Sequence, residues 1–336
     1  MSGWNSYSSE FAFELRVCRW AELSWPPSGD TERPHIVARQ LGTKHRRWDT
    51  IVIECDPKGL RTRSQFGDKA LDRDLLHVVT NAPASWQWYR NALPKPSYAW
   101  RYVRESVHRA ADRGILNIRK RGNKVEIKRI APYPQWVRRI VAIENKPDLT
   151  AAAADSLAEQ IEHDVTARLA DEVWVATAET KDHISPALLE QFPVEAGIIT
   201  LSFETGVTPT SGSVRWHPTS LRSNKPEDSV GGRVDRRLVL AERAYGRGWR
   251  SYHRTMRPDC RQFQLQRDGR SLLPFCAAKK KLPTVRECAG SCDSFEPEPP
   301  QWRMQGWPIE GGPGKGIVDL LAQRRKRERA IAMITQ

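Results

Sequence analysis

The chain of 336 residues has no long apolar run, no signal-peptide pattern and too few acidic residues to balance its basic ones. A membrane-spanning helix needs about 20 mostly apolar residues, so none is predicted. The N-terminus, MSGWNSYSSEFAFELRVCRW, lacks a basic start followed by an apolar block, which argues against a secretory signal peptide. We therefore expect a cytoplasmic protein in a reducing compartment, with no membrane partner.

The shortage of acidic residues is concentrated in one segment. The whole chain has 54 Lys and Arg against 40 Asp and Glu, a formal net charge of +14. Between Arg90 and Arg139 there are 14 basic residues and three acids, so this segment alone carries +11 of the +14. A solvated basic face is the alternative, but positive charge this concentrated favours a polyanionic partner. The predicted partner is nucleic acid, with DNA preferred, and a homo-oligomer is left open.

Hydrophobic periodicity predicts an α/β protein. We expect a helix over 9–24, strands over 35–42 and 48–55, a polar stretch after Asp56, a strand over 136–146, a helix over 154–171, a strand over 172–179, a helix over 185–192 and a strand over 195–206. This order predicts a mixed β-sheet flanked by helices, with a discontinuous core of residues 9–56 and 136–206. Residues 207–233 are predicted to be a linker, 236–296 a Cys-rich module that opens with a helix, and 297–336 a Pro-rich stretch with a basic C-terminal helix.

Residues 84–131 are predicted to form an inserted module. Helical spacing over 98–114 is followed by period-two alternation over 115–130, centred on Arg121-Gly122-Asn123, which predicts a hairpin. A helix followed at once by a basic hairpin is typical of a winged helix. Such a module also binds protein in some cases, but its basic residues suit phosphate contacts. The candidate nucleic-acid-binding residues are Arg101, Arg104, Arg109, Arg119, Lys120, Arg121 and Lys124.

Two acids and one amine are placed for metal-assisted chemistry. Glu144 and Lys146 end the apolar run IVAI and, two residues apart on a strand, project from the same side. Asp49 begins the strand DTIVIEC and can lie across from them. Two neighbouring carboxylates repel unless a cation sits between them, and Mg²⁺ or Mn²⁺ prefers oxygen ligands. Lys146 would orient or deprotonate a water, so the set predicts phosphodiester hydrolysis. The alternative is a surface Glu–Lys pair at a strand end.

Asp49 and Glu144-x-Lys146 resemble the D…(D/E)xK signature of the PD-(D/E)XK nuclease superfamily. The resemblance implies a restriction-endonuclease-like fold over roughly residues 9–206. It also implies accessory roles for Glu14, in the helix before the first strand, and Gln160, in the helix after the lysine strand. The stretches ARQLGT, AIENKPDL and LAERAYGRGW, with the terminal cysteines, are similar to an uncharacterised family from halophilic archaea.

The resemblance implies a metal-dependent nuclease acting on DNA, in DNA repair, defence or mobile-element processing. A non-catalytic DNA-binding regulator that retains the fold is the main alternative, and an adaptor that binds RNA or another partner is a third. Asp148 and Asp164 are secondary acidic candidates: Asp148 suits a turn cap, and Asp164 a solvated helix position.

Four of the six cysteines lie in the C-terminal third: Cys260, Cys276, Cys288 and Cys292. The last two are spaced C-x3-C, close to a metal knuckle. In a reducing compartment these thiols predict a tetrathiolate site that holds Zn²⁺ or a [4Fe–4S] cluster, against the alternative of four unconnected buried thiols. Some nucleases of the superfamily carry a C-terminal cluster with one ligand from before the core, which makes Cys18 a further candidate.

Overall fold

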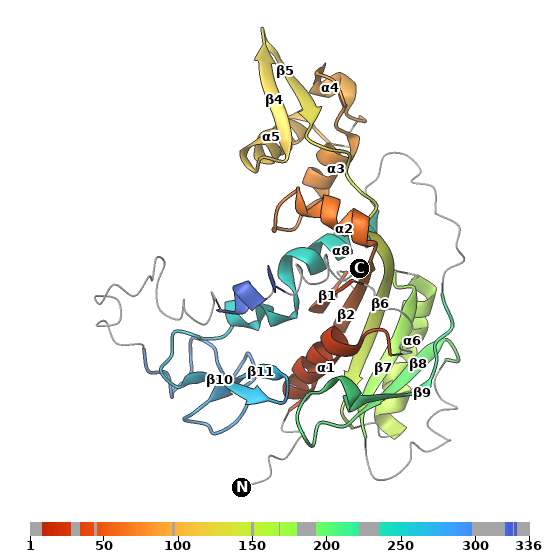
Figure 1. Cartoon of the computed structure of the whole chain (residues 1–336), viewed down its shortest axis with the longest axis vertical. Helices are drawn as coiled ribbons and strands as arrows, with labels where there is room; N and C mark the ends of the chain where they lie inside the picture. The colour runs from red at the N-terminus through yellow and green to blue at the C-terminus, as the bar shows by residue number, and fades with distance from the viewer. Residues whose placement is uncertain are drawn as a thin grey trace.

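The computed structural model describes residues 9–27, 34–43, 46–95, 98–148, 151–167, 169–179, 193–221, 235–297, 320–324 and 326–327. These residues form a mixed α/β fold around a six-stranded sheet, with a smaller lobe projecting from one end (Figure 1). Within the described ranges, every helix is too short or too polar to traverse a bilayer. The helix expected over 185–192 lies outside the described residues, as does most of the Pro-rich stretch.

The central sheet is mixed, as predicted. Its strands, in spatial order, are β1 (His35–Gly42), β2 (Arg47–Cys55), β6 (Val137–Lys146), β7 (Glu172–Ala178), β8 (Ala196–Leu201) and β9 (Gly212–Trp216). Pairing is antiparallel from β1 through β6, parallel from β6 through β8, and antiparallel again at β9. The parallel step from β6 to β7 needs a crossover, which α6 (Ala151–Ala167) supplies. β9 and the short helix η1 (Pro209–Ser211) occupy part of the predicted linker.

Strand β6 is buried on both faces because helices cover both sides of the sheet. Val141 and Ile143 pack in the apolar cluster on the side of α1 (Glu10–Ser24), whereas Ile140 and Ala142 pack with α6 and α8 (Arg236–Arg247). A strand buried on both faces has a continuous apolar sequence, which explains the run IVAI. Alternation along β6 places Glu144 and Lys146 on the α6 side, at the end of this run.

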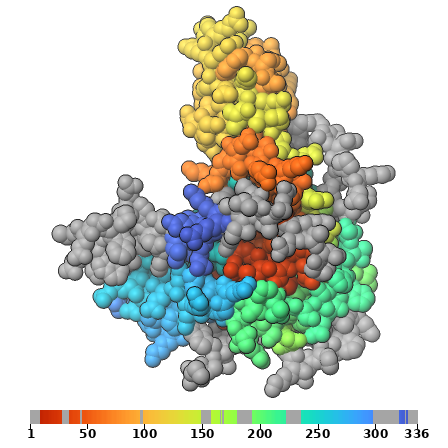
Figure 2. Space-filling view, in the orientation of Figure 1, coloured from red at the N-terminus to blue at the C-terminus, as the bar shows by residue number. Residues whose placement is uncertain are grey.

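The projecting lobe has its own apolar core and its own small sheet. It comprises α2 (Pro57–Ser64), α3 (Arg73–Asn81), β3 (Gln87–Trp88), α4 (Tyr89–Ala92), α5 (Trp100–Asp112), β4 (Leu116–Arg121) and β5 (Lys124–Arg129), with strand order β3-β5-β4. The predicted hairpin is present, with a positive φ of 58° at Gly122 in its turn. Leu75 of α3, Val107 of α5 and Ile127 of β5 are among the core residues. Figure 2 shows the lobe projecting from the main body.

The helices α2 and α3 lie where only a polar stretch was predicted. Both are short, so their apolar residues repeat too few times to show a helical period. Each begins at an aspartate whose side chain accepts a backbone N–H: Asp56 from Gly59 and Asp72 from Leu75. These N-caps were the available signal. The lobe therefore begins before residue 84, since Leu71 and α3 belong to its core.

A buried ion pair joins the lobe to the main body. Arg63 of α2 donates two hydrogen bonds to Glu242 of α8, and both side chains are fully buried. Glu242 also accepts from the Leu71 backbone N–H at 2.8 Å and from the Tyr133 hydroxyl. The carboxylate thus has several donors, which compensates the desolvation of its charge.

The C-terminal segment packs beside α1. It contains η2 (Trp249–Arg254) and the hairpin of β10 (Phe263–Asp268) and β11 (Ser271–Cys276). Residues 277–297 have only turns and isolated bridges. Arg16 of α1 pairs with Asp268 at 2.7 Å, which ties this segment to the main body. The residues described beyond 297 are helical, and Leu321 is buried in the α1-side cluster.

Candidate functional site

Asp49 and Glu144 meet at one end of the sheet. β2 and β6 are antiparallel, with Thr50 opposite Ile143, so the next residues along, Asp49 and Glu144, are neighbours. The backbone N–H of Asn145 donates to Asp49 Oδ2 at 3.1 Å, which fixes the aspartate against the β6 strand end. The two acids lie 95 positions apart in the sequence, and the sheet register brings them together.

An arginine connects Glu144 to a third acid. Arg46 Nη2 lies 2.6 Å from Glu144 Oε1 and 3.0 Å from Asp164 Oδ2, and the Arg46 guanidinium also donates through Nε to Asp164. Asp164 is on α6 and is completely buried. The prediction that Asp164 is a solvated helix residue was therefore wrong, because α6 turns this face toward the end of the sheet. Nothing in the chain's periodicity indicated a partner in the loop before β2.

Glu14 is part of the same carboxylate group, as the resemblance implied for an accessory acid. Gln40 joins Glu14 to Asp49, since its Nε2 donates to Glu14 Oε1 at 3.1 Å and to Asp49 Oδ1 at 3.0 Å. Gln40 has a positive φ of 52°, a conformation that is uncommon for residues other than glycine. Arg39 forms a two-pronged ion pair with Glu14 at 2.9 and 3.0 Å. Burial raises the pKa of Glu14 most, Arg39 opposes this, and the nearby Asp49 adds to it.

The pKa of Glu144 is raised as well. Its side chain is 3% exposed, and burial together with the charge of Asp49 raises its pKa to about 8, although Arg46 and Lys146 act in the opposite direction. The Arg46 contact lacks hydrogen-bond geometry, so Glu144 Oε1 is a buried oxygen without a hydrogen-bond partner, as is Asn145 Oδ1. A buried acceptor without a donor is costly, and the Arg46 ion pair at 2.6 Å compensates part of that cost for Glu144.

Lys146 and Gln160 lie at the margin of this group. Lys146 is partly exposed, its Nζ is 3.8 Å from Glu10 Oε1, and its charge acts on Glu144. Gln160 is half-buried on α6, one turn before Asp164 and therefore on the same helix face. Asp148, the other secondary candidate, is exposed beyond the strand end. The described residues thus gather Asp49, Glu144, Lys146 and Glu14 in one place.

Arginines that the sequence analysis did not single out flank these acids. Arg243 and Arg247 of α8 donate to the backbone carbonyls of Gly42 and Gln40, beside Asp49. Burial lowers the pKa of Arg247 most, and the charges of Arg39, Arg243, Arg254 and Arg47 lower it further. Because the charges of four other arginines act on Arg247, positive charge is concentrated beside these acids. The i, i+4 spacing of Arg243 and Arg247 on α8 was a signal that they share a face.

The basic residues proposed for nucleic-acid contact are on the projecting lobe, and several of them are engaged within it. Arg109 pairs with Asp72, and Arg119 pairs with Glu126 at 2.7 Å. Arg101, Arg104, Lys120, Arg121 and Lys124 are exposed. Aromatic rings interleave with these charges: Arg119 lies over Trp86 with 4.5 Å to the ring centroid, Lys124 over Trp88 with 5.1 Å, and Arg101 over Tyr102 with 4.7 Å.

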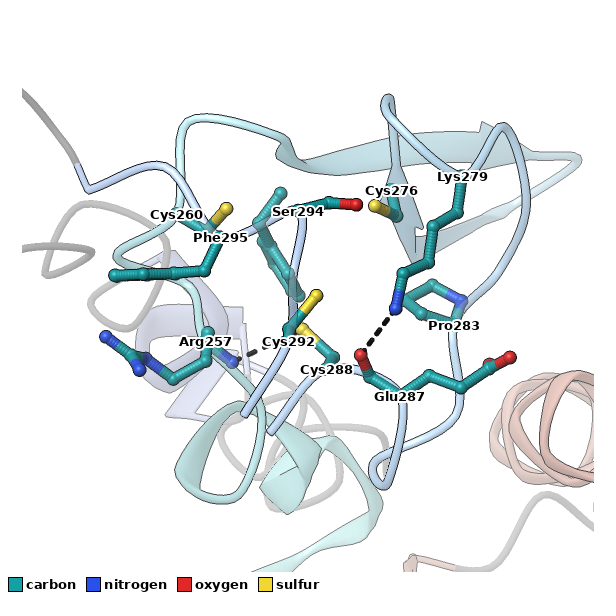
Figure 3. A pocket seen from close by; sticks show the side chains of 11 residues that line it. Arg257, Cys260, Cys276, Lys279, Pro283, Glu287, Cys288, Cys292, Ser294 and Phe295 are labelled. Carbon is teal, nitrogen blue, oxygen red and sulfur yellow. Dashed lines mark hydrogen bonds between the residues drawn. The ribbon is translucent and has the colours of Figure 1, made fainter. Parts of the chain in front are cut away.

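The four C-terminal cysteines line one small cavity of about 20 Å³, although 32 residues separate the first from the last. Figure 3 shows Cys260 and Cys276 entering from opposite sides, with Cys288 and Cys292 between them. Cys18 is elsewhere, in α1, with its Sγ 3.3 Å from Thr50 Oγ1, and it does not line the cavity. Among the residues that the structure describes, no three His, Cys, Asp or Glu side chains are arranged closely enough to hold a metal ion as they stand.

Residues 36–297 match a protein family described as a family of unknown function (DUF5787). The chain belongs to this family. The matched region includes Asp49, Glu144, Lys146 and all four C-terminal cysteines, but Glu14 precedes it. No curated protein and no solved structure matches the chain.

Proposed function

We propose that this DUF5787 protein is a metal-dependent nuclease that hydrolyses phosphodiester bonds in DNA. The observation that carries the proposal is the convergence of Asp49 and Glu144 across β2 and β6, with Lys146 on the same face of the strand end. This is the arrangement that the PD-(D/E)XK resemblance implies, and the mixed sheet flanked by helices is compatible with a restriction-endonuclease-like fold.

The donor set suits Mg²⁺ or Mn²⁺. Mg²⁺ is commonly bound by one or two carboxylates and completes its coordination with waters and phosphate oxygens. Asp49 and Glu144 would supply the carboxylates, and the ion would share Glu144 with the Arg46 guanidinium, which lies 2.6 Å from Glu144 Oε1. When bound, the ion would supply Lewis-acid stabilisation of the phosphate charge and lower the pKa of a bound water. Burial first, and then the charge of Asp49, raise the pKa of Glu144, and a bound cation would lower it.

The chain's own residues then have separable roles. The Lys146 ammonium, at the partly exposed end of β6, would hold and orient the attacking water or neutralise charge on the phosphate. Glu14 and Gln40 position Asp49 through the Gln40 amide. Gln160 projects from the face of α6 that carries Asp164. Arg46 holds Glu144 and Asp164 together by direct ion pairs.

The projecting lobe would hold the DNA. From α3 onward, its order of helix, strand, two helices and hairpin, with strands arranged β3-β5-β4, is compatible with a winged helix, which supports a DNA-binding role. Within it, α5 would contribute Arg101 and Arg104, and the hairpin Lys120, Arg121 and Lys124. Arg109 and Arg119 have acidic partners in the lobe, so we expect them to stabilise the lobe rather than to contact DNA.

The test is cleavage of supercoiled plasmid and of single-stranded DNA by the purified chain with Mg²⁺, with Mn²⁺ and with chelator. We expect metal-dependent cutting that Lys146→Ala abolishes while DNA binding is kept. Lys58→Ala, which removes an exposed lysine from α2, is the matched control and should cut normally. Cutting that persists in Lys146→Ala, or cutting of RNA alone, would contradict the proposal.

One observation favours the alternative of a non-catalytic DNA-binding regulator. Arg46 already neutralises Glu144 and Asp164, so the acids have a permanent cationic partner. If that pair replaces the metal, the protein will bind DNA with a steep salt dependence but will cut no substrate with either ion. In that case Arg46→Ala, which removes the cationic partner, would still not bind Mg²⁺ or Mn²⁺.

A further inference from the structure

We propose that Cys260, Cys276, Cys288 and Cys292 bind one zinc ion in a tetrathiolate site that holds the C-terminal segment together. This site is separate from Asp49 and Glu144 and does not depend on the proposed nuclease activity. Its basis is the meeting of four thiols, from three separate stretches of chain, at one cavity in a part of the molecule with little regular structure.

The fold brings the thiols together by local turns. Cys276 ends β11, and its backbone N–H bonds to Lys281. The N–H of Cys260 bonds to Arg257, that of Cys288 to Thr284 and that of Cys292 to Ala289, so each lies at a tight turn. Cys288 is near enough to the other three for their charges to interact. Among the described residues, the four thiols line the cavity but are not arranged as metal ligands. Rotation about χ1 can change the direction in which each sulfur points.

Backbone N–H groups and a lysine approach the sulfurs, and thiolates accept hydrogen bonds from such donors. The backbone N–H of Arg257 donates to Cys288 Sγ at 3.4 Å, and that of Glu296 to Cys260 Sγ at 3.5 Å. Lys279 faces the cavity and hydrogen bonds to Cys292, whereas the Arg257 guanidinium pairs with Asp259 at 2.7 Å and points away from the sulfurs (Figure 3). Glu287 is the one carboxylate that lines it, and it is engaged by Lys281 and by the backbone of Thr284. Four thiolates and one Zn²⁺ carry a net charge of −2, which Lys279 offsets in part.

The donor set and the small cavity suit a single metal ion. A volume of about 20 Å³ holds one particle the size of a water molecule, for which about 10–15 Å³ is the minimum. A single Zn²⁺ fits, and Zn²⁺ with four cysteines is a common structural site.

The segment also needs a cross-link. Residues 277–297 contain no helix or strand, and a stretch of this length is rarely ordered by itself. The adjoining hairpin of β10 and β11 has only two strands, which are marginally stable alone. A metal that joins Cys260, Cys276 and the C-x3-C turn would connect the hairpin to both ends of this stretch.

The experiment is elemental analysis of the full-length protein, purified without chelator, together with its visible spectrum. We expect one zinc per chain, no iron and no inorganic sulfide. Titration of the thiols with a mercurial reagent should release the zinc, and chelation should lower the denaturation midpoint. Iron with sulfide, or a folded protein free of zinc after growth with zinc, would overturn the proposal.

Variants separate a ligand role from a packing role. Cys292→Ser and Cys288→Ser should each lose at least tenfold in zinc affinity. Cys292→His, which replaces one zinc ligand by another, should still bind zinc. Cys55→Ala, which removes a buried thiol far from the cavity, is the control and should retain zinc. If the Ser variants fold and keep full zinc, the four cysteines are not the site.

Discussion

The pH dependence of stability offers a quantitative test of the crowded carboxylates. The perturbation is Glu144→Gln, which keeps the shape of the side chain but removes its charge. In the unfolded chain this carboxyl ionises near pH 4.5, whereas in the folded chain its pKa is raised to about 8, first by burial and then by Asp49. Between these two values the native state holds a proton that the unfolded state has lost. The contribution of Glu144 to stability is therefore complete below pH 4.5 and is lost as the pH rises to about 8.

The magnitude follows from the interval. Each pH unit between the two pKa values corresponds to about 1.4 kcal/mol at 25 °C. The interval from 4.5 to about 8 gives a loss on the order of 4–5 kcal/mol for the metal-free protein. The Gln variant lacks this loss, so its stability relative to the native chain should rise by about that amount between pH 4.5 and pH 8, and level off above pH 8.

The assay is urea unfolding of both proteins across pH 4.5–9 in the presence of a chelator. Glu159→Gln, which removes an exposed carboxyl from α6, is the control and should not change with pH relative to the native chain. Repeating the series with Mg²⁺ should flatten the loss in the native protein only, because the ion favours the ionised carboxylate. A difference between the native chain and Glu144→Gln that stays constant across this range would refute the reasoning.

Two further predictions concern the projecting lobe. Arg63→Met leaves Glu242 buried without its main cationic partner and should cost about 3–5 kcal/mol in the free energy of unfolding. Adding Glu242→Gln should recover part of this loss, because it removes the unpaired charge but keeps an acceptor for Leu71 and Tyr133; equal losses in the single and double variants would show that the unpaired charge is not the cause. Lys120→Ala with Lys124→Ala should weaken binding to duplexes of any sequence and reduce the slope of log K against log salt concentration by about 2. An unchanged slope in filter-binding or anisotropy titrations would show that these two lysines do not contact the DNA.

Much of the candidate site could be predicted because its signals are local in the sequence. Glu144 and Lys146 follow an apolar run long enough to identify a buried strand, and their spacing of two fixes a common side. Asp49 was found because it stands at the start of a second such strand. The role of Arg46 and the burial of Asp164 could not be predicted, since both depend on how α6 packs across the strand end. The arginines of α8 were missed for the same reason, because residues 236–247 approach β1 only in the folded chain.

The sequence by itself determined the mixed α/β class, the basic hairpin after α5 and the positions of the acids at strand ends, because hydrophobic periodicity and turn residues act over a few neighbouring positions. Tertiary structure alone decided that Glu14, Asp49 and Glu144 share one group and that Arg46 joins it. It also decided that four distant thiols line one cavity and that Cys18 does not. These outcomes depend on strand register and helix packing, which bring together residues far apart in the chain and which no local pattern records.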